Sequence, residues 1–186
     1  MADLARSEPR GSSQLAASGR APFSSPGFTL RELTPVPKIR IQALRGRTAG
    51  PQESLPATPN TVSGTDPVFL WRAPADWLAY SASMPLAALV DAVGKAAPDC
   101  LLTDMSSGLV LLELAGPKSV DILMRDCTLD LEGGEVSVGR CAQTVLAQVN
   151  VTLHCCGPEP AWRVFVERSV CLHLWDWLVD SAGLCP

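Results

Sequence analysis

The sequence predicts an α+β protein with a mostly antiparallel sheet and helices packed on one side of it. Short segments rich in β-branched and aromatic residues come in pairs separated by turn residues, as they do in antiparallel hairpins. Stretches with apolar residues at helical spacing lie between these pairs and after the last of them. The change from strand to helix in the central stretch, Leu101–Thr128, organises the elements on both sides of it.

The first third of the chain differs in composition from the rest. Residues 1–37 are rich in Ser, Ala, Gly, Pro and Arg without a hydrophobic period, and we expect them to form a flexible N-terminal tail. Residues 38–66 are predicted to hold an edge strand, because Lys38–Ile41 alternates charged and apolar side chains, followed by a Pro/Gly-rich linker. Residues 67–186 are predicted to form a single α+β domain.

The predicted domain opens with a hairpin and a helix. Val68–Trp71 and Trp77–Tyr80 flank a turn at residues 73–76. Ser83 is expected to cap the helix that follows. The apolar stripe of this helix has the i, i+3, i+4, i+7 spacing and consists of Leu86, Leu89, Val90 and Val93.

The central stretch is predicted to form a strand pair and a helix. A buried strand at Leu101–Met105 and a second strand at Leu109–Leu114 are separated by the turn residues 106–108. Glu113 is charged within an apolar strand, so it needs a partner or an exposed face. Gly116-Pro117 then opens a helix. Its predicted apolar face consists of Val120, Leu123, Met124 and Cys127.

The last part of the chain is predicted to form a long hairpin and a closing helix. Residues 144–156 alternate with period two, which predicts one antiparallel strand with one wet face, and Trp162–Val166 is its partner. Ser169 is expected to cap the closing helix. Trp175 and Trp177, with the leucines beside them, give this helix more apolar surface than one core face requires. We therefore expect part of it to form an interface.

Composition excludes several classes of protein. Charged residues make up 18% of the chain and the net charge is −4, which argues against a dedicated nucleic-acid binder. No apolar run is long enough for a transmembrane helix, and no secretory signal is visible, so we expect a cytoplasmic protein without a membrane partner. The 7 cysteines are scattered without a C-x-x-C pair, which favours free thiols over a disulfide framework or a zinc site.

The residues offer no convincing catalytic constellation. The chain has 2 histidines and no G-x-S-x-G motif, so a serine hydrolase is disfavoured. His154 and Cys156 converge on one side of a strand, but two ligands without a second pair make a weak metal site. His173 near Asp176 resembles a base with its orienting carboxylate, although an ion pair on a helix surface is commoner. We predict no catalytic, cofactor-binding or metal-ligating residue.

Two further residues stand at the junction between a Gly-rich loop and a strand. Arg140 and Gln143, in G-R-C-A-Q-T, can either tie backbone carbonyls of this loop or bind groups of a partner protein, and the sequence leaves both roles open. The residues that we predict for a subunit interface are therefore Arg140, Gln143, Trp175 and Trp177.

Several motifs together resemble a known family. They are Leu102–Ser106, Leu114–Pro117, Asp126–Leu131, Gly139–Thr144 and Leu174–Leu178. With them the chain is similar to the gamma subunit of heterotetrameric sarcosine oxidase and, more distantly, to the folate-binding fold of aminomethyltransferase, the glycine-cleavage T protein. The similarity covers about Val68 to Ala182, and the last two motifs are its most specific parts.

The resemblance implies a non-catalytic subunit that supports the assembly of a complex. Such a complex oxidatively demethylates sarcosine to glycine, forms hydrogen peroxide and transfers the one-carbon unit to tetrahydrofolate. The resemblance implies larger flavin-containing alpha and beta subunits and a small delta subunit as partners, which would hold FAD, FMN, NAD, zinc and tetrahydrofolate. A free-standing folate-dependent aminomethyltransferase-like protein and a binding module that uses the Trp175/Trp177 face remain alternatives.

Overall fold

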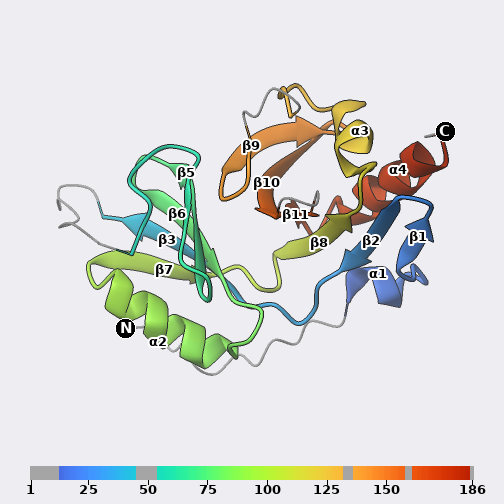
Figure 1. Ribbon diagram of the computed structural model, residues 1–186. Coiled ribbons are helices and arrows are strands. Elements are labelled where there is room, and N and C mark those ends of the chain that lie inside the picture. The colour runs from blue at the N-terminus through green and yellow to red at the C-terminus, as the bar shows by residue number, and fades with distance from the viewer. Residues whose placement is uncertain (1–12, 45–53, 132–135, 158–160, 185–186) are drawn as a thin grey trace. The chain divides into compact units, whose positions relative to one another are not determined.

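The computed structural model describes residues 13–44, 54–131, 136–157 and 161–184 (Figure 1). The chain divides into two compact units. Within the described residues, the first unit is built from Pro35–Ser107, and the second from Ser12–Thr34 together with Gly108–Pro186. The second unit therefore takes segments from both sides of the first in sequence.

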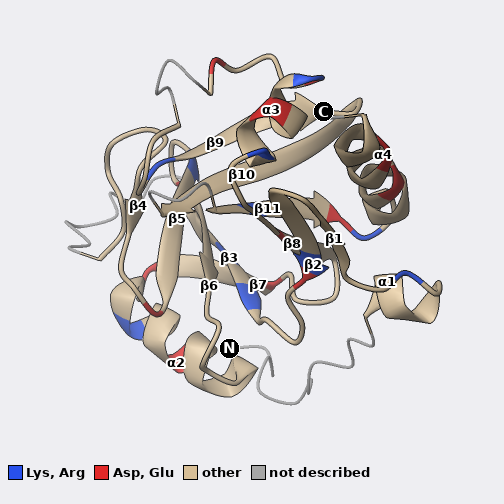
Figure 2. Cartoon of the chain, turned by 45° about the vertical axis from the view of Figure 1, so that its right-hand side comes forward, with Lys and Arg blue, Asp and Glu red and all other residues tan. Residues whose placement is uncertain are grey.

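The first unit is an antiparallel sheet of 5 strands with one helix. The strands lie in the order β4-β5-β6-β3-β7. The helix is α2, Leu86–Ala96, which carries exposed Asp91 and Lys95 on its outer side, and Figure 2 shows acidic and basic residues along it. The strands are β3 (Lys38–Ala43), β4 (Val62–Ser63), β5 (Val68–Ala73), β6 (Asp76–Tyr80) and β7 (Cys100–Asp104).

The core of the first unit forms where α2 covers one face of this sheet. Alternate residues along a strand point to the same face, so Ile39 and Ile41 of β3 lie beside Phe69 of β5 in one apolar cluster. The helix contributes Leu86, Leu89 and Val93 of the predicted stripe to the buried cluster, and Val90, its fourth residue, packs against the cluster while partly buried. The Ser83 cap is wrong, because α2 starts after Pro85 without a side-chain cap and the Ser83 hydroxyl bonds the Asp66 carboxylate instead.

The second unit is an antiparallel sheet of 6 strands, with order β1-β2-β8-β11-β10-β9. Its strands are β1 (Phe23–Ser25), β2 (Phe28–Glu32), β8 (Leu109–Ala115), β9 (Cys141–Leu146), β10 (Val149–Gly157) and β11 (Ala161–Glu167). Its helices are α1 (Gln14–Ala17), α3 (Ser119–Met124) and α4 (Cys171–Gly183).

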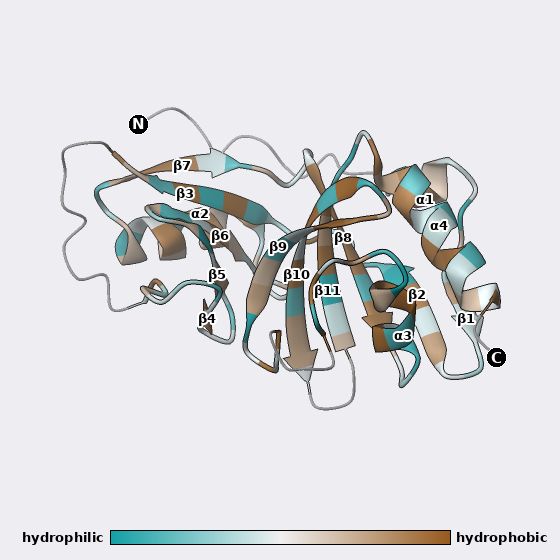
Figure 3. Ribbon diagram, turned by 90° about the horizontal axis from the view of Figure 1, so that it is seen from above, coloured by the Kyte–Doolittle hydropathy of each residue, from teal (hydrophilic) through white to brown (hydrophobic). Residues whose placement is uncertain are grey.

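Apolar side chains from neighbouring strands make the core of the second unit. Leu30, Leu114 and Trp162 occupy one cross-strand row of β2, β8 and β11, and all are almost fully buried. Leu174 and Leu178 of α4 join the same cluster, so the closing helix covers this face of the sheet. Figure 3 shows hydrophobic and hydrophilic residues alternating along these strands. The predicted α+β class with antiparallel strands is confirmed, although the strands are divided between two sheets.

The N-terminal part of the chain differs from the flexible tail that we expected over residues 1–37. Residues 1–12 lie outside the described part, but β1 and β2 pair with each other, and β2 pairs with β8. Phe28 and Leu30 are buried by this pairing. The two residues are too few to show a period, and their partner strand lies far along the chain, so composition alone could not reveal the strand. The predicted domain start at residue 67 likewise differs from the first unit, which includes β3.

The strand pair predicted for the central stretch is wrong. β7 pairs with β3 at the end of the 5-stranded sheet, whereas β8 lies between β2 and β11 in the other sheet. Ser106-Ser107-Gly108 therefore connects the two units instead of closing a hairpin. β7 is also not a buried strand, since Leu101 is 51% exposed. The local spacing of strands and turn residues suggested a hairpin. It could not show that β7 pairs with β3 and that β8 pairs with β2 and β11, because these partners are distant along the chain.

The long strand predicted over residues 144–156 is a hairpin of β9 and β10. Ala147 and Gln148 form its turn, with φ of 50° and 63°. Tight hairpin turns with two positive φ angles usually contain Asn or Gly, so Ala-Gln gave no signal. The turn also shifts the alternation by one residue, because Leu146 pairs with Val149 and lies on the same face. Val145, which the period-two pattern placed on the face of Val151 and Leu153, is therefore 44% exposed.

α3 (Ser119–Met124) and α4 (Cys171–Gly183) both start later than predicted. α3 buries Ile122 and Leu123, whereas Met124, placed on the apolar face by the sequence, is 37% exposed. α4 starts at Cys171 after Val170, without a side-chain cap, so the expected Ser169 cap is wrong. None of the helices that the structure describes combines the length and the apolar character that crossing a membrane requires.

Two glycines meet where the β1–β2 turn approaches the start of α3. Gly116 has φ of +112°, and a Cβ added to it would lie 2.4 Å from the carbonyl oxygen of Gly27. The same oxygen accepts a hydrogen bond from the Lys118 amide at 3.1 Å. The Leu114–Pro117 motif therefore requires glycine at position 116, both for its backbone angle and for this close approach.

We expect Gly116→Ala to lower the free energy of unfolding by about 2–4 kcal/mol, since strain at positive φ and a backbone clash both destabilise the fold. Denaturant titration followed by tryptophan fluorescence measures this change. Gly183→Ala is the matched control, because it lies in α4 of the same unit and its added Cβ meets nothing within 4 Å. The control should change stability by no more than about 1 kcal/mol. Equal effects of the two substitutions would contradict the role given to Gly116.

Candidate subunit-interface site

Gln143 lies on β9, an outer strand of the second unit, and Arg140 directly precedes this strand. The Arg140 amide donates to Ser137 at 2.9 Å, and the Arg140 carbonyl accepts from the Cys155 amide at 3.1 Å. The backbone of Arg140 therefore closes the turn before β9 and joins it to β10. The Arg140 side chain is half-buried, and Gln143, which pairs with Thr152 across the strands, is exposed. The structure thus supports a structural role for the Arg140 backbone and leaves both side chains accessible.

Two exposed valines flank these residues. Val138 is 54% exposed and Val145 is 44% exposed. We call Val138, Arg140, Gln143 and Val145 the β9 surface. Such a mixture of apolar groups with an arginine and an amide is typical of protein interfaces.

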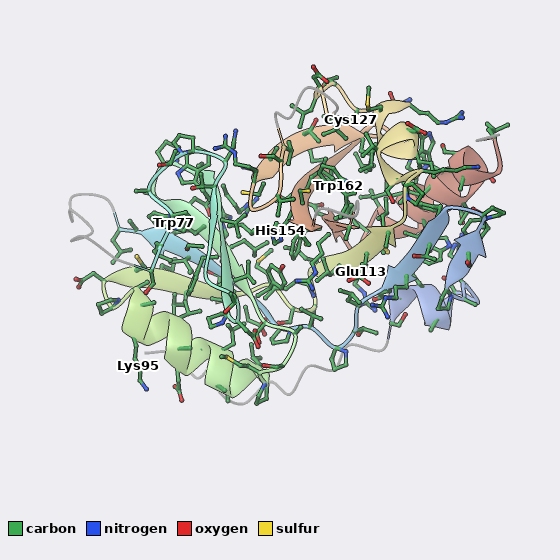
Figure 4. The ribbon with its side chains drawn as sticks, viewed as in Figure 1. Trp77, Lys95, Glu113, Cys127, His154 and Trp162 are labelled. Carbon is green, nitrogen blue, oxygen red and sulfur yellow. The ribbon has the colours of Figure 1, made fainter. Side chains whose placement is uncertain are left out.

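The far end of β9 is partly covered by the segment that follows α3. Cys127 forms an isolated bridge with Leu146, and its Sγ lies 3.8 Å from Thr144 Oγ1. Thr128 Oγ1 lies 3.4 Å from the same hydroxyl. Figure 4 labels Cys127 in this segment. The Asp126–Leu131 motif therefore acts by covering an open strand edge.

The two tryptophans of α4 differ in exposure. Trp175 is only 4% exposed and belongs to the core of the second unit, whereas Trp177 is half-buried at the margin of that core. The buried positions of α4 follow helical spacing and are Cys171, Leu174, Trp175, Leu178, Ser181 and Ala182. The apolar surface that the sequence suggested was in excess is thus mostly used against the chain's own sheet. Trp175 is corrected to a core residue, and Trp177 stays a predicted interface residue.

The polar stripe of α4 binds other parts of the second unit. His173 Nε2 donates to the Ala147 carbonyl at 2.9 Å, which ties the helix to the β9–β10 turn. Asp176 accepts two hydrogen bonds from the Arg20 guanidinium, at 2.8 and 2.5 Å. The hydrogen bond from Arg20 lowers the pKa of Asp176. Because each side chain has another partner, His173 and Asp176 do not form the base and orienter that their spacing suggested.

His154 and Cys156 converge on one side of β10, as the strand alternation predicted. The distance between Cys156 Sγ and His154 Nδ1 is 3.5 Å. Burial lowers the pKa of His154 to about 4, with a smaller contribution from Arg163. Burial also raises the pKa of the Cys156 thiol to about 11. At neutral pH both groups are therefore uncharged, whereas a nucleophilic cysteine acts as the thiolate. In the described part of the chain, no three side chains of the metal-ligating types are grouped to hold an ion.

Glu113 has the partners that its place in an apolar strand required. Arg31 of β2 lies opposite it and donates to its Oε1 from Nε at 2.8 Å and from Nη2 at 2.5 Å. Arg163 of β11 lies on the other side, with Nε 4.0 Å from Oε2. This row of charges crosses three strands, and Figure 4 labels Glu113 in it. The sequence showed that Glu113 needs a partner or an exposed face. It could not identify Arg31 and Arg163 as the partners, because both arginines come from strands that are distant along the chain.

A second ionic cluster, missed at the sequence level, lies in the first unit. Asp76 of β6 accepts from Arg40 of β3, with Nη2 2.5 Å from Oδ2. Arg72 Nη1 lies 3.9 Å from Asp76 Oδ1. Burial lowers the pKa of Arg72. The sequence signal for this cluster is that Arg40, Arg72 and Asp76 are charged residues within segments predicted as strands or their turn.

Comparison of the fold defines the broad class of protein. The glycine cleavage system aminomethyltransferase T from Bartonella henselae superposes with a TM-score of 0.58 at 13% identity, covering 82% of this chain and 45% of that one. At this identity the likeness shows a shared fold. The chain is therefore an α+β protein with an aminomethyltransferase-like fold, as the folate-binding-domain resemblance implied.

The family is narrower than this class. The family model described as "Sarcosine oxidase, gamma subunit family" matches residues 49–183 of this chain. A chain of the heterotetrameric sarcosine oxidase from Corynebacterium sp. U-96, solved in complex with pyrrole 2-carboxylate, has a TM-score of 0.78 and 28% identity, covering 96% of this chain and 95% of that one. The chain belongs to the sarcosine oxidase gamma subunit family, which confirms the resemblance seen in its motifs.

Curated relatives agree with this assignment. The sarcosine oxidase subunit gamma of Corynebacterium sp. strain U-96 is 31% identical over 163 residues, which cover 82% of this chain and 78% of the relative. The subunit gamma of an Arthrobacter species is 28% identical over 162 residues, with the same two coverages of 82% and 78%. The similarity therefore extends over most of both chains.

The low pKa of His154 makes stability depend on pH. Between the ordinary pKa of 6.5 and about 4, the unfolded chain binds a proton that the folded chain does not, so stability falls as pH falls through this window. We expect a loss of about 3 kcal/mol between pH 7 and pH 4, from the free energy that corresponds to one pKa unit. Denaturant titrations across this range should show a smaller loss for His154→Gln. A wild-type slope in His154→Gln would refute the assignment.

The two tryptophans of α4 should differ in how much they contribute to the stability of the fold. We expect Trp175→Ala to lower the free energy of unfolding by about 3–5 kcal/mol, because it leaves a large cavity in the core. Trp177→Ala should cost clearly less, since its side chain is half-buried. Thermal unfolding monitored by circular dichroism measures both. A Trp177→Ala chain as unstable as Trp175→Ala would show that Trp177 also serves the core.

Proposed function

We propose that this chain is the non-catalytic gamma subunit of a heterotetrameric sarcosine oxidase and that it supports assembly of the complex. The observation that carries the proposal is the similarity to a chain of the solved heterotetramer, which covers 96% of this chain with a TM-score of 0.78. Family membership over residues 49–183 supports the same assignment.

The proposal includes the partners and their chemistry. In the complex, larger alpha and beta subunits and a small delta subunit would hold FAD, FMN, NAD, zinc and tetrahydrofolate. Oxidation of sarcosine there reduces oxygen to hydrogen peroxide and releases glycine, while tetrahydrofolate accepts the one-carbon unit. The gamma subunit would contribute contact surface to this reaction and no reacting group.

The chemistry of the described side chains supports a structural role. The thiol and imidazole of Cys156 and His154 are uncharged at neutral pH. His173 and Asp176 bind Ala147 and Arg20, which stabilises the chain's own fold. The β9 surface and Trp177 are the parts of the second unit that we propose for contact with another subunit.

The proposal predicts that the tagged chain, produced together with the other subunits, retains flavin-containing chains during affinity purification. Retention is scored by flavin absorbance and by the ratio of subunits on a gel. The double variant Arg140→Ala/Gln143→Ala should lower retention about tenfold if these side chains lie within an interface. Circular dichroism of the variant checks that its fold is intact.

Two results would contradict the proposal. Failure of the wild-type chain to retain any flavin-containing partner would refute membership in the complex. Saturable, tight binding of tetrahydrofolate to the isolated chain would favour the alternative, a free-standing folate-dependent aminomethyltransferase-like protein. Isothermal titration with tetrahydrofolate tests that alternative directly.

A further inference from the structure

We propose that residues 13–22 form a strap that opens from and closes over α4 while the rest of the second unit stays folded. The ion pair between Arg20 and Asp176 is the interaction that holds it closed. We call residues 13–22 the N-terminal strap, which contains α1 and ends directly before β1. The proposal concerns a movement within this chain, so it goes beyond the proposed function and requires no partner subunit.

The N-terminal strap is folded by its own short-range hydrogen bonds. The Ser13 side chain caps α1 by accepting from the Ala16 amide at 2.9 Å. At the other end of α1, the Gly19 amide donates to the Ala16 carbonyl at 3.0 Å. The Arg20 amide donates to the Leu15 carbonyl at 2.8 Å. These two bonds, with Gly19 at φ of +79°, form a Schellman motif, which turns the chain directly after α1 and fixes the backbone of Arg20.

Side chains of the N-terminal strap attach it to α4, to β2 and to the core. Leu15 is 2% exposed and belongs to the core cluster of the second unit. The Ser13 hydroxyl donates to the Glu32 carboxylate of β2. The Arg20 guanidinium donates to both carboxylate oxygens of Asp176, at 2.8 and 2.5 Å, so this ion pair is bidentate. α1 and α4 are in contact, and Figure 3 shows them side by side.

The strap covers the side of α4 that carries Asp176. Leu172 precedes Asp176 by four positions and Val179 follows it by three, so the three side chains share one side of the helix. Leu172 and Val179 are partly buried and pack against the core cluster. Closing the strap therefore keeps an apolar side of α4 from water, and opening the strap exposes it.

The strap is held more weakly than the strands beside it. Leu15 is its one buried residue, whereas residues 16–19 are exposed. α1 has 4 residues, which are too few for a helix to persist once it leaves the surface on which it packs. Segments with few buried contacts and exposed hydrogen bonds open locally at a lower free energy than the core. The strap therefore opens as a unit, and the hydrogen bonds of α1 break when it does.

The ion pair that closes the strap responds to salt, because both of its charges are near the solvent. The side chains of Arg20 and Asp176 are 26% and 54% exposed. Salt screens an ion pair of this exposure, whereas the apolar contact of Leu15 involves no charge. Added salt should therefore open the strap through the Arg20–Asp176 pair.

Hydrogen exchange of the full chain, resolved to single amides, measures the opening. The amides of Ala17 and Arg20 bond within the strap and report its opening. The amides of Leu112 and Val164, which pair in the middle of β8 and β11, report the opening of the core. Relative to their intrinsic rates, the strap amides should exchange at least about 100-fold faster than the core amides. Raising the salt to about 1 M should speed exchange of the strap amides by about fivefold.

Variants of the ion pair identify the interaction that holds the strap closed. Asp176→Asn removes one charge and keeps the shape of the side chain, so the strap amides should exchange about fivefold faster at low salt and lose their response to added salt. Arg20→Gln removes the other charge and should give the same result without altering α4. Asp180→Asn is the matched control, because Asp180 is exposed on the same helix and loses the same charge. This control should keep the wild-type rates and salt response.

The inference fails under either of two results. Strap amides that exchange as slowly as those of Leu112 and Val164 would show that the strap opens only when the whole unit unfolds. Wild-type exchange and salt response in both Asp176→Asn and Arg20→Gln would show that this ion pair does not hold the strap closed. Neither result bears on the proposed function, which is tested separately by retention of the flavin-containing chains.

Discussion

The pairing of β2 with β8 is the interaction on which the second unit depends. It brings Leu30 into one row with Leu114 and Trp162, and it places Arg31 opposite Glu113. Without β2, the charge of Glu113 would lose its closest partner, and the apolar face of β8 would lose its neighbour. The turn of the same arm also meets Gly116 at the start of α3. One short hairpin near the N-terminus thus fixes both the edge of the sheet and the Leu114–Pro117 motif.

What could be predicted from the sequence follows from the range of the interactions involved. The β5–β6 hairpin and α2 depend on neighbours close in sequence, and both were found from spacing alone. β1 and β2 were missed because two buried apolar residues carry no period and their partner is remote. The β9–β10 turn was missed because Ala147 and Gln148 adopt positive φ without the residues that normally indicate it. β7 and β8 were paired wrongly because a local turn signal cannot show that each strand has a better partner elsewhere.

The candidate site shows the same division in a different form. Spacing placed His154 and Cys156 on one side of a strand, and the structure agrees. The electrostatic consequence needed the structure, because burial lowers one pKa and raises the other until neither group is charged at neutral pH. Helical spacing also found the apolar surface of α4, but only the sheet beneath it shows that Trp175 is part of the core and that Trp177 lies at its margin. An apolar stripe in a sequence states how much surface must be covered, and not what covers it.

That last point applies to sheet edges as well as to helices. A chain that acts alone must protect each long edge by its own segments, as the residues after α3 do for β9. A chain that belongs to an assembly can leave an edge open, provided that another subunit covers it soon after folding. Val145 of β9 and Leu101 of β7 are similarly exposed, and in the described part of the chain Cys127 forms a bridge with Leu146 at the outer side of β9. Exposure of an apolar side chain therefore does not show by itself whether the backbone beside it is covered.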